Sequence, residues 1–246
     1  MLFQFENGEV LLVNKPLTWT SFDVVGKMRS IIRQRTGLRK IKIGHAGTLD
    51  PLATGLLILC TGKFTKRIDE FQGLEKEYTG TLRLGATTPS FDLETEVDET
   101  FPLSAFTDGD PLTVRALIID AANHFVTTFD QVPPQFSAIK VDGKRAYKSA
   151  RKDINVEIKA RQVRISTFDI TRIELPDVDF RVICSKGTYI RSLARDFGLF
   201  LGCGAHLTTL CRTRIGSFNL HDAYELNDLQ NLIPDTNNLT KKVIIL

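Results

Sequence analysis

The sequence predicts an α+β fold with one large mixed sheet, mainly antiparallel, that is flanked by helices and loops. Three observations support this fold class. Residues 156–185 are rich in strand-forming runs such as VRISTFDI and DFRVICS. The connections between these runs are short, which favours antiparallel pairing. Elsewhere, a few segments repeat apolar residues at helical intervals, and mixing of the two kinds of segment is typical of α+β domains.

The composition is that of a globular protein. With 246 residues, of which 42% are hydrophobic, the chain can form one sizeable domain or two small ones. It has no apolar run of about 18 residues, and its N-terminal stretch lacks the regions of a secretory signal. The four cysteines are too scattered for a disulfide framework and fit a reducing compartment. We therefore expect a cytoplasmic enzyme or binding protein.

The N-terminal part predicts a helix followed by two strands. Thr20 and Asp23 have the spacing of a helix capping pair, and apolar residues then recur at helical intervals until Gly37. Alternation at residues 41–43 predicts a half-buried strand, and the apolar run at residues 56–59 predicts a buried one. A loop should join these two strands.

The rest of the chain alternates between strands and short helices. Thr113 and Thr188 are expected to cap two helices, and Asp142 with Gly143 predicts a turn. Residues 88–113 are acidic and lack hydrophobic periodicity, so we expect a solvated excursion there. The remaining predicted elements are strands at residues 8–13, 78–84, 156–158 and 206–218 and helices at residues 64–71, 113–125, 146–151 and 222–232.

Charge is unevenly distributed although the net charge is only +3. Residues 15–42 contain eight basic residues and one acid, and residues 140–164 contain nine basic residues and three acids. Residues 90–114 contain seven acids and no basic residue. The basic stretches are candidates for a phosphate-binding surface, with ordinary solvated faces as the alternative.

The loop between the two N-terminal strands, GHAGTLDPLATG at residues 44–55, carries a single carboxylate, Asp50. Its glycines allow tight turns or the close approach of a ligand, and Pro51 restricts Asp50 to extended or turn geometry. An Asp-Pro turn in a connecting loop is the simplest interpretation of the dipeptide alone. The complete string, with His45 and Thr48 near Asp50, favours a functional site.

Six segments of the chain together carry a family resemblance. In chain order they are LLVNKPLTWTS, GHAGTLDPLATGLLILCTGKFTK, KEYTGTLRLG, QVPPQFSAIKVDGKRAYKSAR, SKGTYIRSLARDFG and LTTLCRTRIGSF. They cover most of residues 9–218 and resemble, in the same order, the TruB family of tRNA pseudouridine synthases. The resemblance implies the pseudouridine synthase catalytic fold, with the aspartate of the GTLD segment, Asp50, as the catalytic nucleophile.

The resemblance also implies supporting roles around Asp50. Arg191 is expected to pair with Asp50, and its place in the first turn of a predicted helix, where the dipole does not favour a cation, fits a separate partner. Tyr78 is expected beside the flipped base and Leu210 in the apolar lining of the site. From the residues alone, a core aromatic side chain is the simpler interpretation of Tyr78.

Two further residues have a family role and a simpler alternative. His45 holds the family position of an imidazole that displaces the target base, whereas in isolation it is a structural loop histidine. Lys15 belongs to the segment that supports the catalytic loop in the family, whereas in isolation it is a surface lysine before a turn.

Residues from about 126 to 152 are expected to form an RNA-binding insertion that closes over the RNA hairpin loop, and such a segment should be mobile in the free protein. Its RNA-binding candidates are Lys140, Lys144, Arg145, Tyr147, Lys148 and Arg151. Residues from about 220 to 246 are too few for the complete PUA domain that many members of the family carry. We therefore expect a single catalytic domain over residues 1–246 with a short C-terminal tail.

The implied activity is isomerisation of the T-loop uridine 55 of tRNA to pseudouridine by base flipping. It requires no cofactor, and the chain has neither a GxxxxGK[ST] nor a GxGxxG motif. A monomer that binds the T-stem-loop, with no obligatory protein partner and no membrane, is expected. A tRNA-refolding chaperone without chemistry and an RNA-guided relative in a larger particle are the alternatives.

The nearest metal-like group in the sequence is Cys203, His206 and Cys211. It lacks a fourth ligand and a CxxC pair, so we expect no metal site and explain these residues by packing.

Overall fold

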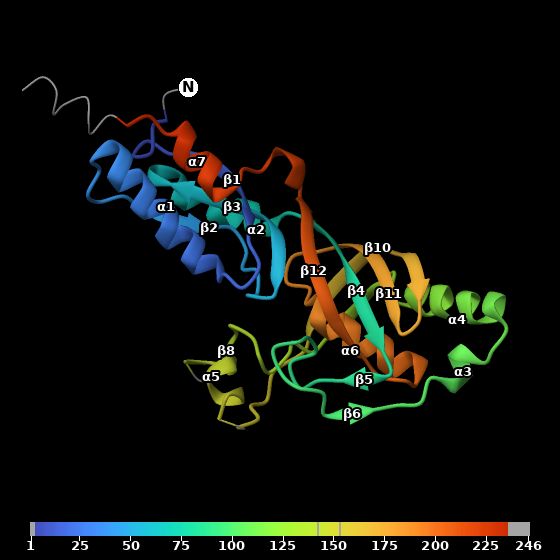
Figure 1. Ribbon diagram of the computed structural model, residues 1–246. Helices are drawn as coiled ribbons and strands as arrows, with labels where there is room; N and C mark the ends of the chain where they lie inside the picture. Colours follow the sequence, from blue (N-terminus) through green and yellow to red (C-terminus); the bar gives the residue numbers. More distant parts are fainter. Residues whose placement is uncertain (1–2, 142, 153, 236–246) are drawn as a thin grey trace, which may run out of the picture. The chain divides into compact units, whose positions relative to one another are not determined.

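The computed structural model describes residues 3–141, 143–152 and 154–235 (Figure 1). The chain forms two compact units. The first comprises Met1–Lys76 and Cys211–Leu246, and the second comprises Glu77–Leu210. The predicted turn at Asp142 and the end of the predicted tail, residues 236–246, lie outside the described residues.

The first unit contains the predicted N-terminal strands and helix. Its elements are β1 (Val10–Lys15), α1 (Ser21–Thr36), β2 (Ile43–His45), β3 (Ala53–Thr61), the 3-10 helix η1 (Gly62–Arg67), α2 (Ile68–Gly73), residues 211–215 of β12 (Ala205–Ile215), β13 (Phe218–Asn219), the 3-10 helix η2 (Leu220–Asp222) and α7 (Leu226–Leu232). Its strand order is β1-β3-β12, with β2 also on β3 and β13 also on β12. The antiparallel register of β1 and β3 places Lys15 opposite Gly55.

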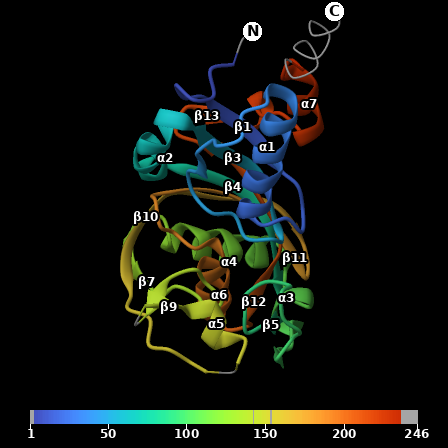
Figure 2. The same cartoon turned by 90° about the vertical axis from the view of Figure 1, so that its left-hand side faces the viewer.

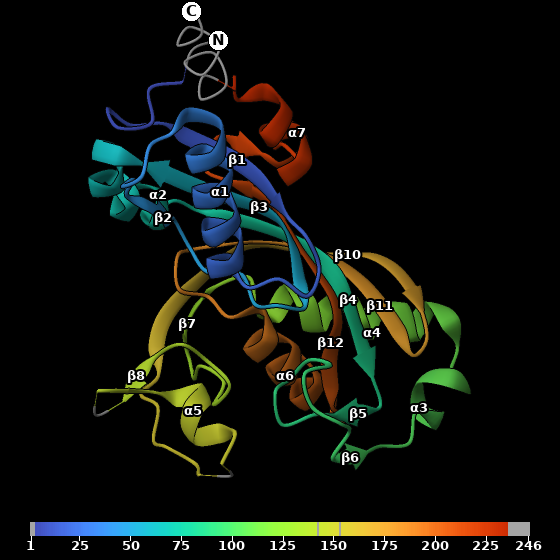
Figure 3. The ribbon, with the colours of Figure 1, turned by 60° about the vertical axis from the view of Figure 1, so that its left-hand side comes forward.

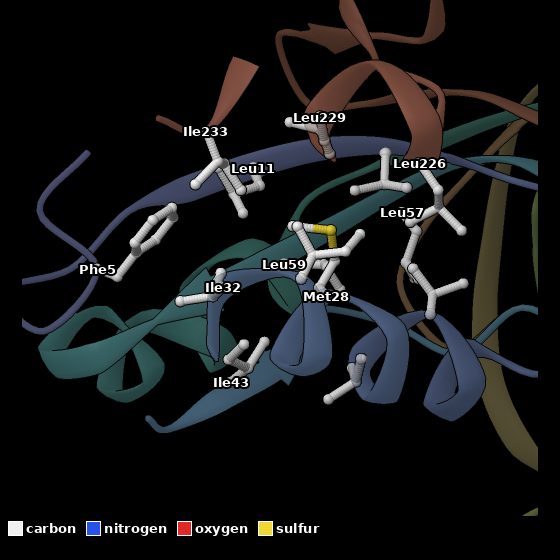
Figure 4. Close-up of a cluster of buried hydrophobic side chains, with 14 residues drawn as sticks. Phe5, Leu11, Met28, Ile32, Ile43, Leu57, Leu59, Leu226, Leu229 and Ile233 are labelled. Carbon is white, nitrogen blue, oxygen red and sulfur yellow. The ribbon is translucent and has the colours of Figure 1, made fainter. Parts of the chain in front are cut away.

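The core of the first unit lies between α1, α7 and the sheet. Figure 4 shows Met28 and Ile32 of α1 gathered with Leu57 and Leu59 of β3 and with Leu229 of α7. Met28, Ile32, Leu57 and Leu59 are fully buried, and burial of each such side chain contributes about 1.5–3 kcal/mol. The C-terminal segment therefore supplies part of the core that supports β3.

The ends of α1 follow the sequence prediction. The Thr20 side chain accepts from the Asp23 amide and the Asp23 side chain accepts from the Thr20 amide, which completes a capping box. Gly37 ends the helix in the left-handed conformation, with φ 75°. Local sequence is therefore sufficient to fix both ends of this helix.

The second unit contains most of the sheet. Its elements are β4 (Lys76–Leu84, from Glu77 on), β5 (Ala86–Thr87), β6 (Glu99–Thr100), α3 (Ser104–Thr107), α4 (Pro111–His124), β7 (Thr128–Gln131), β8 (Lys140–Val141), β9 (Lys144–Arg145), α5 (Ala146–Ala150), β10 (Arg161–Glu174), β11 (Asp177–Cys184), α6 (Ile190–Leu201) and residues 205–210 of β12. The strand order is β12-β4-β11-β10-β7. β10 pairs antiparallel with both β11 and β7.

Two helices cover one face of this part of the sheet. Figure 2 shows α4 and α6 side by side within the curve of β10. Phe197 of α6 packs against Phe168 of β10 with ring centroids 5.5 Å apart, and Phe168 contacts Phe180 of β11 at 6.0 Å. These aromatic contacts fix α6, and with it Arg191, on the sheet.

The predicted fold class is confirmed, with a large sheet and flanking helices, but several local predictions are wrong. Helix α4 is capped by Asp110, whose side chain accepts from the Thr113 amide, so Thr113 is not its cap. Helix α6 begins after Tyr189, because the Thr188 hydroxyl donates instead to the Ser185 carbonyl.

Two predictions about longer segments also fail. Residues 156–158 are not a strand, because the Gln135 side chain donates to the Val156 carbonyl and accepts from its amide in place of a neighbouring strand. Residues 88–113 are not wholly solvated: Ser90 and Asp92 are buried, and Phe106 of the short helix α3 is 7% exposed.

Candidate active site

Asp50 lies half-buried in the loop between β2 and β3, within the first unit. The predicted loop is shorter than residues 44–55, because β2 continues to His45 and β3 begins at Ala53. The Asp50 carbonyl accepts from the Ala53 amide at 3.1 Å, which closes a turn directly after the carboxylate. Asp50 is thus held in a tight connection between two paired strands.

Two glycines make this connection possible. Gly47 and Gly55 have φ values of 107° and 104°, which other residues rarely adopt. A Cβ atom on Gly55 would lie 2.4 Å from the Arg212 carbonyl oxygen of β12. The close approach of β3 to β12 therefore requires glycine at position 55, as the motif suggested.

Arg212 is the side chain that holds the first half of the loop. It is 1% exposed, and its Nε donates to the Leu56 carbonyl at 2.7 Å. Its two terminal nitrogens donate to the carbonyls of Gly47 at 3.1 Å and Thr48 at 3.4 Å. A planar guanidinium can bond three carbonyls at once, which fixes the backbone that precedes Asp50.

Ser21, at the start of α1, holds the next residue of the loop. Its hydroxyl accepts from the Leu49 amide at 2.8 Å and donates to the Leu49 carbonyl at 3.1 Å. Ser21 is 2% exposed and Leu49 is 3% exposed, so both bonds are protected from water. The capped helix α1 thereby positions the residue before Asp50.

Lys15 holds the second half of the loop, and its interpretation as a surface lysine is wrong. The side chain is fully buried, and its Nζ donates to the carbonyls of Trp19 at 2.6 Å, Pro16 at 2.9 Å and Pro51 at 3.4 Å. Burial lowers the pKa of Lys15 to about 8, and the negative charge of Asp50 partly opposes that shift. Lys15 therefore places a cation within electrostatic reach of Asp50.

The segment between Lys15 and α1 is strained where it meets the loop. Thr18 has φ 69°, an unusual value for a β-branched residue, and its amide donates to the Pro51 carbonyl at 2.8 Å. Backbone strain of this kind costs about 1–3 kcal/mol and persists where surrounding contacts impose it. The Pro51 carbonyl thus receives two donors.

His45 ends β2 and pairs with Leu59 of β3. Burial lowers the pKa of its imidazole, the positive charge of Arg212 lowers it further, and a hydrogen bond with the Gly47 backbone partly offsets both. Within the described residues, its Nδ1 atom is buried without a hydrogen-bond partner. His45 is therefore a neutral imidazole at the start of the Asp50 loop.

Arg191 lies in the second unit, in the first turn of α6 as expected, and is 3% exposed. Its terminal nitrogens donate to the carbonyls of Ser90 at 3.1 Å and Phe136 at 2.9 Å. Its Nε lies 3.6 Å from the Asp92 carboxylate. The backbone at Phe91 is strained, with φ 62°, so the segment that receives Arg191 is tightly shaped.

Tyr78 and Leu210 lie on neighbouring strands of the second unit, β4 and β12. Tyr78 is 9% exposed and faces the same side as Leu82 and Leu84, as the alternation predicted. Leu210 is half-buried. The two side chains offer aromatic and aliphatic surface.

The predicted RNA-binding segment is a small hairpin followed by one helical turn (Figure 3). Lys140, Arg145 and Lys148 are exposed, whereas the Lys144 side chain lies outside the described part of the structure. Arg151 pairs with Glu94 at 2.7 Å and lies over the Tyr147 ring at 5.4 Å. The segment thus exposes the positive charges of Lys140, Arg145 and Lys148, whereas the charge of Arg151 is paired with an acid.

Four residues that shape the candidate site were not predicted from the sequence. Arg212 and Ser21 hold the Asp50 loop, and Ser90 and Asp92 hold Arg191. Arg212 lies in a strand that also carries threonines and a second arginine, Arg214, so the sequence pattern did not set it apart. Asp92 was hidden in an acidic stretch that resembled a solvated surface.

Cys203 and His206 are buried, and the His206 Nδ1 lies 3.0 Å from the Ala86 carbonyl. The described residues contain no group of three or more potential ligands that could hold a metal ion. No helix in the described ranges has both the length and the apolarity needed to span a bilayer.

Comparison with known proteins shows the family to which the chain belongs. The model of the TruB family pseudouridylate synthase N-terminal domain matches residues 33–190, and that of the tRNA pseudouridylate synthase B C-terminal domain matches residues 191–244. The chain is therefore a pseudouridylate synthase by class. Within that class it belongs to the TruB family.

Similar proteins are found among curated sequences. A protein of Flavobacterium johnsoniae named tRNA pseudouridine synthase B is 54% identical over 91% of this chain and 95% of its own length. A protein of the same name from Bacteroides thetaiotaomicron is 56% identical over 90% of this chain and 91% of its own length.

A solved structure, a crystal structure of a Cbf5-Nop10-Gar1 complex, contains a similar chain. It matches with a TM-score of 0.66 and 29% identity over 92% of this chain. The match spans 54% of that chain, so the likeness concerns about half of it.

Proposed function

We propose that this protein is a tRNA pseudouridine synthase that isomerises the T-loop uridine 55, with Asp50 as the nucleophile. The activity class is that of its relatives, which are named tRNA pseudouridine synthase B and align over most of both chains. The observation that carries the assignment of Asp50 is the anchoring of its loop: Lys15, Ser21 and Arg212 together bond the backbone on both sides of this one carboxylate.

The reaction breaks the bond between the ribose C1′ and uracil N1 and forms a bond between C1′ and C5. The C5 hydrogen leaves as a proton and N1 gains a proton, so no oxidant or reductant is needed. A carboxylate that adds to the substrate and later departs is regenerated in each cycle. Asp50, in a loop whose geometry is fixed before substrate arrives, is suited to this role.

Electrostatics support an anionic nucleophile at this position. The Lys15 ammonium interacts with Asp50, and the Arg212 guanidinium bonds the loop that carries it. A carboxylate attacks as a nucleophile only in its ionised form. We assign the final cationic partner to Arg191, whose guanidinium is buried and oriented by the Ser90 and Phe136 carbonyls.

The other residues are assigned to the extruded base. A uridine must leave its stack to expose C1′ and C5 to a protein side chain. Tyr78 would stack on the uracil and Leu210 would line the apolar side of the slot. The neutral His45 would help to displace the base, without a role in proton transfer.

The exposed Lys140, Arg145 and Lys148 would contact phosphates of the T-stem-loop, together with Lys144, Tyr147 and Arg151. We propose that the enzyme acts as a monomer in the cytoplasm and without a cofactor, metal or obligatory protein partner. The cysteines at positions 60, 184, 203 and 211 form no disulfide, which fits a reducing compartment.

Turnover by the Asp50→Asn variant tests the proposal. Pseudouridine formation on a single T-stem-loop should be abolished, while the affinity for tRNA stays within a few fold of wild type. Asp69→Asn is a matched control, because Asp69 is an exposed acid of α2 in the same unit. Near-normal turnover by Asp50→Asn would refute the assignment, and binding without turnover by the wild-type protein would indicate a non-catalytic chaperone.

A further inference from the structure

The segment that follows β7 runs along the first turn of α6, and Gln131 lies at the start of this contact. Gln131 is the last residue of β7, pairs with Arg161 of β10 and is fully buried. A buried side-chain amide needs hydrogen-bond partners, because an unsatisfied polar group in the protein interior lowers stability. The partners of Gln131 therefore show which part of the chain it holds.

Both partners belong to Tyr189, the residue at which α6 begins. The Gln131 Nε2 donates to the Tyr189 carbonyl at 3.1 Å, and its Oε1 accepts from the Tyr189 amide at 2.8 Å. The Tyr189 side chain itself makes no capping hydrogen bond within the part of the chain that the structure describes. Amides at the start of a helix lack partners inside the helix. Gln131 thus fixes the start of α6 from a neighbouring strand.

A second hydrogen bond ties the next residue of this segment to α6. Ser192 is fully buried, and its hydroxyl donates to the Val132 carbonyl at 2.8 Å. Pro133 and Pro134 follow and are also buried. The proline ring fixes φ, so the backbone of these two residues is restricted to a narrow range of conformations. The placement set at Gln131 is therefore carried along the segment.

The far end of the same segment is an acceptor for Arg191. The Phe136 carbonyl accepts from one terminal nitrogen of Arg191 at 2.9 Å, and the Ser90 carbonyl accepts from the other at 3.1 Å. Gln131 holds the residue two positions before Arg191 and also begins the segment that ends at Phe136. It therefore fixes both the helix that carries the guanidinium and a carbonyl that orients it. All of these residues lie in the second unit.

Gln135 makes the same kind of contact with a different part of the chain. Its side chain donates to the Val156 carbonyl and accepts from the Val156 amide. Val156 lies in the irregular segment before β10, which carries none of the residues proposed for the site. A glutamine bonded twice to one backbone residue is therefore not in itself a sign of function. What sets Gln131 apart is the helix turn that it holds.

We infer that Gln131 is a positioning residue that sets the orientation of the Arg191 guanidinium for the reaction. This inference rests on the proposed function, in which Arg191 is the final cationic partner of the Asp50 carboxylate. An amide side chain suits the role because it carries a donor and an acceptor at one end. An ionised carboxylate only accepts, and a thioether is at most a weak acceptor.

The test compares Gln131→Met with a control from the same unit. Gln131→Met keeps the length of the side chain and removes both bonds to Tyr189. The control is Thr81→Val, which removes the hydroxyl that donates to Asp179 at 2.8 Å. Thr81 lies on the face of β4 opposite to Tyr78. The single-turnover rate constant at saturating T-stem-loop, the Kd for the T-stem-loop and the unfolding midpoint are measured for each protein.

Gln131→Met should lower the single-turnover rate constant about 10- to 100-fold, because misplacement by about 1 Å can cost about 100-fold. The Kd should stay within a few fold of wild type. Thr81→Val should keep the wild-type rate constant even where it lowers the unfolding midpoint. An unchanged rate constant in Gln131→Met, or an equal loss of rate in Thr81→Val, would overturn the inference.

Ser192→Ala keeps the test decisive if Gln131→Met does not fold. It removes only the bond to the Val132 carbonyl, so it should lower the rate constant in the same direction by a smaller factor, again without a change in Kd. A Ser192→Ala protein that loses affinity and keeps its rate constant would contradict the inference.

A double-mutant cycle shows whether Gln131 acts through Arg191. In an Arg191→Lys background, Gln131→Met should lower the rate constant by a much smaller factor, because a single ammonium group lacks the planar fork that two carbonyls orient. Residues that act independently have additive effects. The same factor in both backgrounds would therefore show that Gln131 does not act through Arg191.

Failure of this inference is distinguishable from failure of the proposed function. Wild-type protein that binds the T-stem-loop and forms no pseudouridine would refute the proposed function. Wild-type turnover together with an unchanged rate constant in Gln131→Met would refute only the role of Gln131.

Discussion

The Asp50 loop and the segment from Lys140 to Arg151 are held in opposite ways. Every carbonyl from Gly47 to Pro51 accepts a hydrogen bond, and the donors include the buried side chains of Lys15, Ser21 and Arg212. The segment at 140–151 consists of two-residue strands and one helical turn, whose buried side chains are two alanines.

The two regions differ because the Asp50 loop must position a nucleophile, whereas the 140–151 segment need only attract phosphates. A nucleophile must be held within a fraction of an ångström of a productive position, and misplacement by about 1 Å can cost about 100-fold in rate. Attraction of phosphates depends on charge and tolerates movement. Changes in the Asp50 loop should therefore affect stability and turnover together, whereas changes in the 140–151 segment should affect affinity alone.

The largest effect is expected for Arg212→Ala. It removes a guanidinium that is 1% exposed and donates to the carbonyls of Gly47, Thr48 and Leu56, and should lower the free energy of unfolding by about 3–5 kcal/mol. Arg212→Lys should recover part of the stability but not kcat, because one ammonium cannot bond three carbonyls. Denaturant unfolding and single-turnover kinetics would check this, and full turnover by Arg212→Lys would show that the loop does not need the guanidinium.

The next effect concerns Lys15 and its pH dependence. The pKa of this buried lysine is about 8 in the folded protein, whereas an unperturbed lysine has a pKa of 10.5, so the folded state binds fewer protons than the unfolded state between these values. The stability of the wild type relative to Lys15→Met should therefore increase as pH rises from 8 to 10.5, by up to about 1.4 kcal/mol per pH unit.

Urea unfolding of wild type and Lys15→Met at pH values from 7 to 10 would measure this difference. Parallel stability curves would show that Lys15 titrates normally. They would also remove the physical reason for regarding this lysine as a desolvated cation next to Asp50.

A smaller effect, confined to binding, is expected for the triple variant Lys140→Gln, Arg145→Gln and Lys148→Gln. These exposed side chains should contribute about 0.7–0.9 each to the salt slope of tRNA binding. The free energy of unfolding should change by less than about 0.5 kcal/mol. Limited proteolysis should cleave this segment in the free protein and spare it with tRNA; resistance in both states would contradict the expected mobility.

The smallest effect is expected at His45. Its pKa is lowered by burial and by Arg212, so the imidazole should remain mostly neutral at pH 6.5. Because the unfolded chain binds this proton more readily, the contribution to stability is lost as pH falls below 6.5. Titration of the His45 ring protons by NMR would check this, and a midpoint above 6.5 would contradict it.

Prediction from sequence succeeded where local chemistry decides the outcome. The cap formed by Thr20 and Asp23, the glycine at the end of α1 and the alternation around Tyr78 each depend on residues close in the chain. The fold class and the family could also be predicted from the sequence, because six long segments resemble the family in the same order along the chain.

Prediction failed where distant residues compete for the same backbone groups. Residues 156–158 have strand propensity, but the Gln135 amide takes the hydrogen bonds of Val156. Asp110 rather than Thr113 caps α4, since Pro111 is well suited to the first helical position. The roles of Arg212 and Asp92 depend on burial, which sequence pattern alone does not reveal for a charged residue. The assignments of Asp50 and its partners remain predictions.

Gly55 has a consequence for how this protein can evolve. Its φ of 104° and the 2.4 Å that would separate an added Cβ atom from the Arg212 carbonyl oxygen leave no space for a side chain. A saturation library at this codon should yield no folded alternative, even in a host that tolerates an inactive product. Gly55 should therefore not tolerate substitution during evolution. The exposed basic residues of the 140–151 segment can change one at a time, whereas the turn that carries Asp50 requires this glycine.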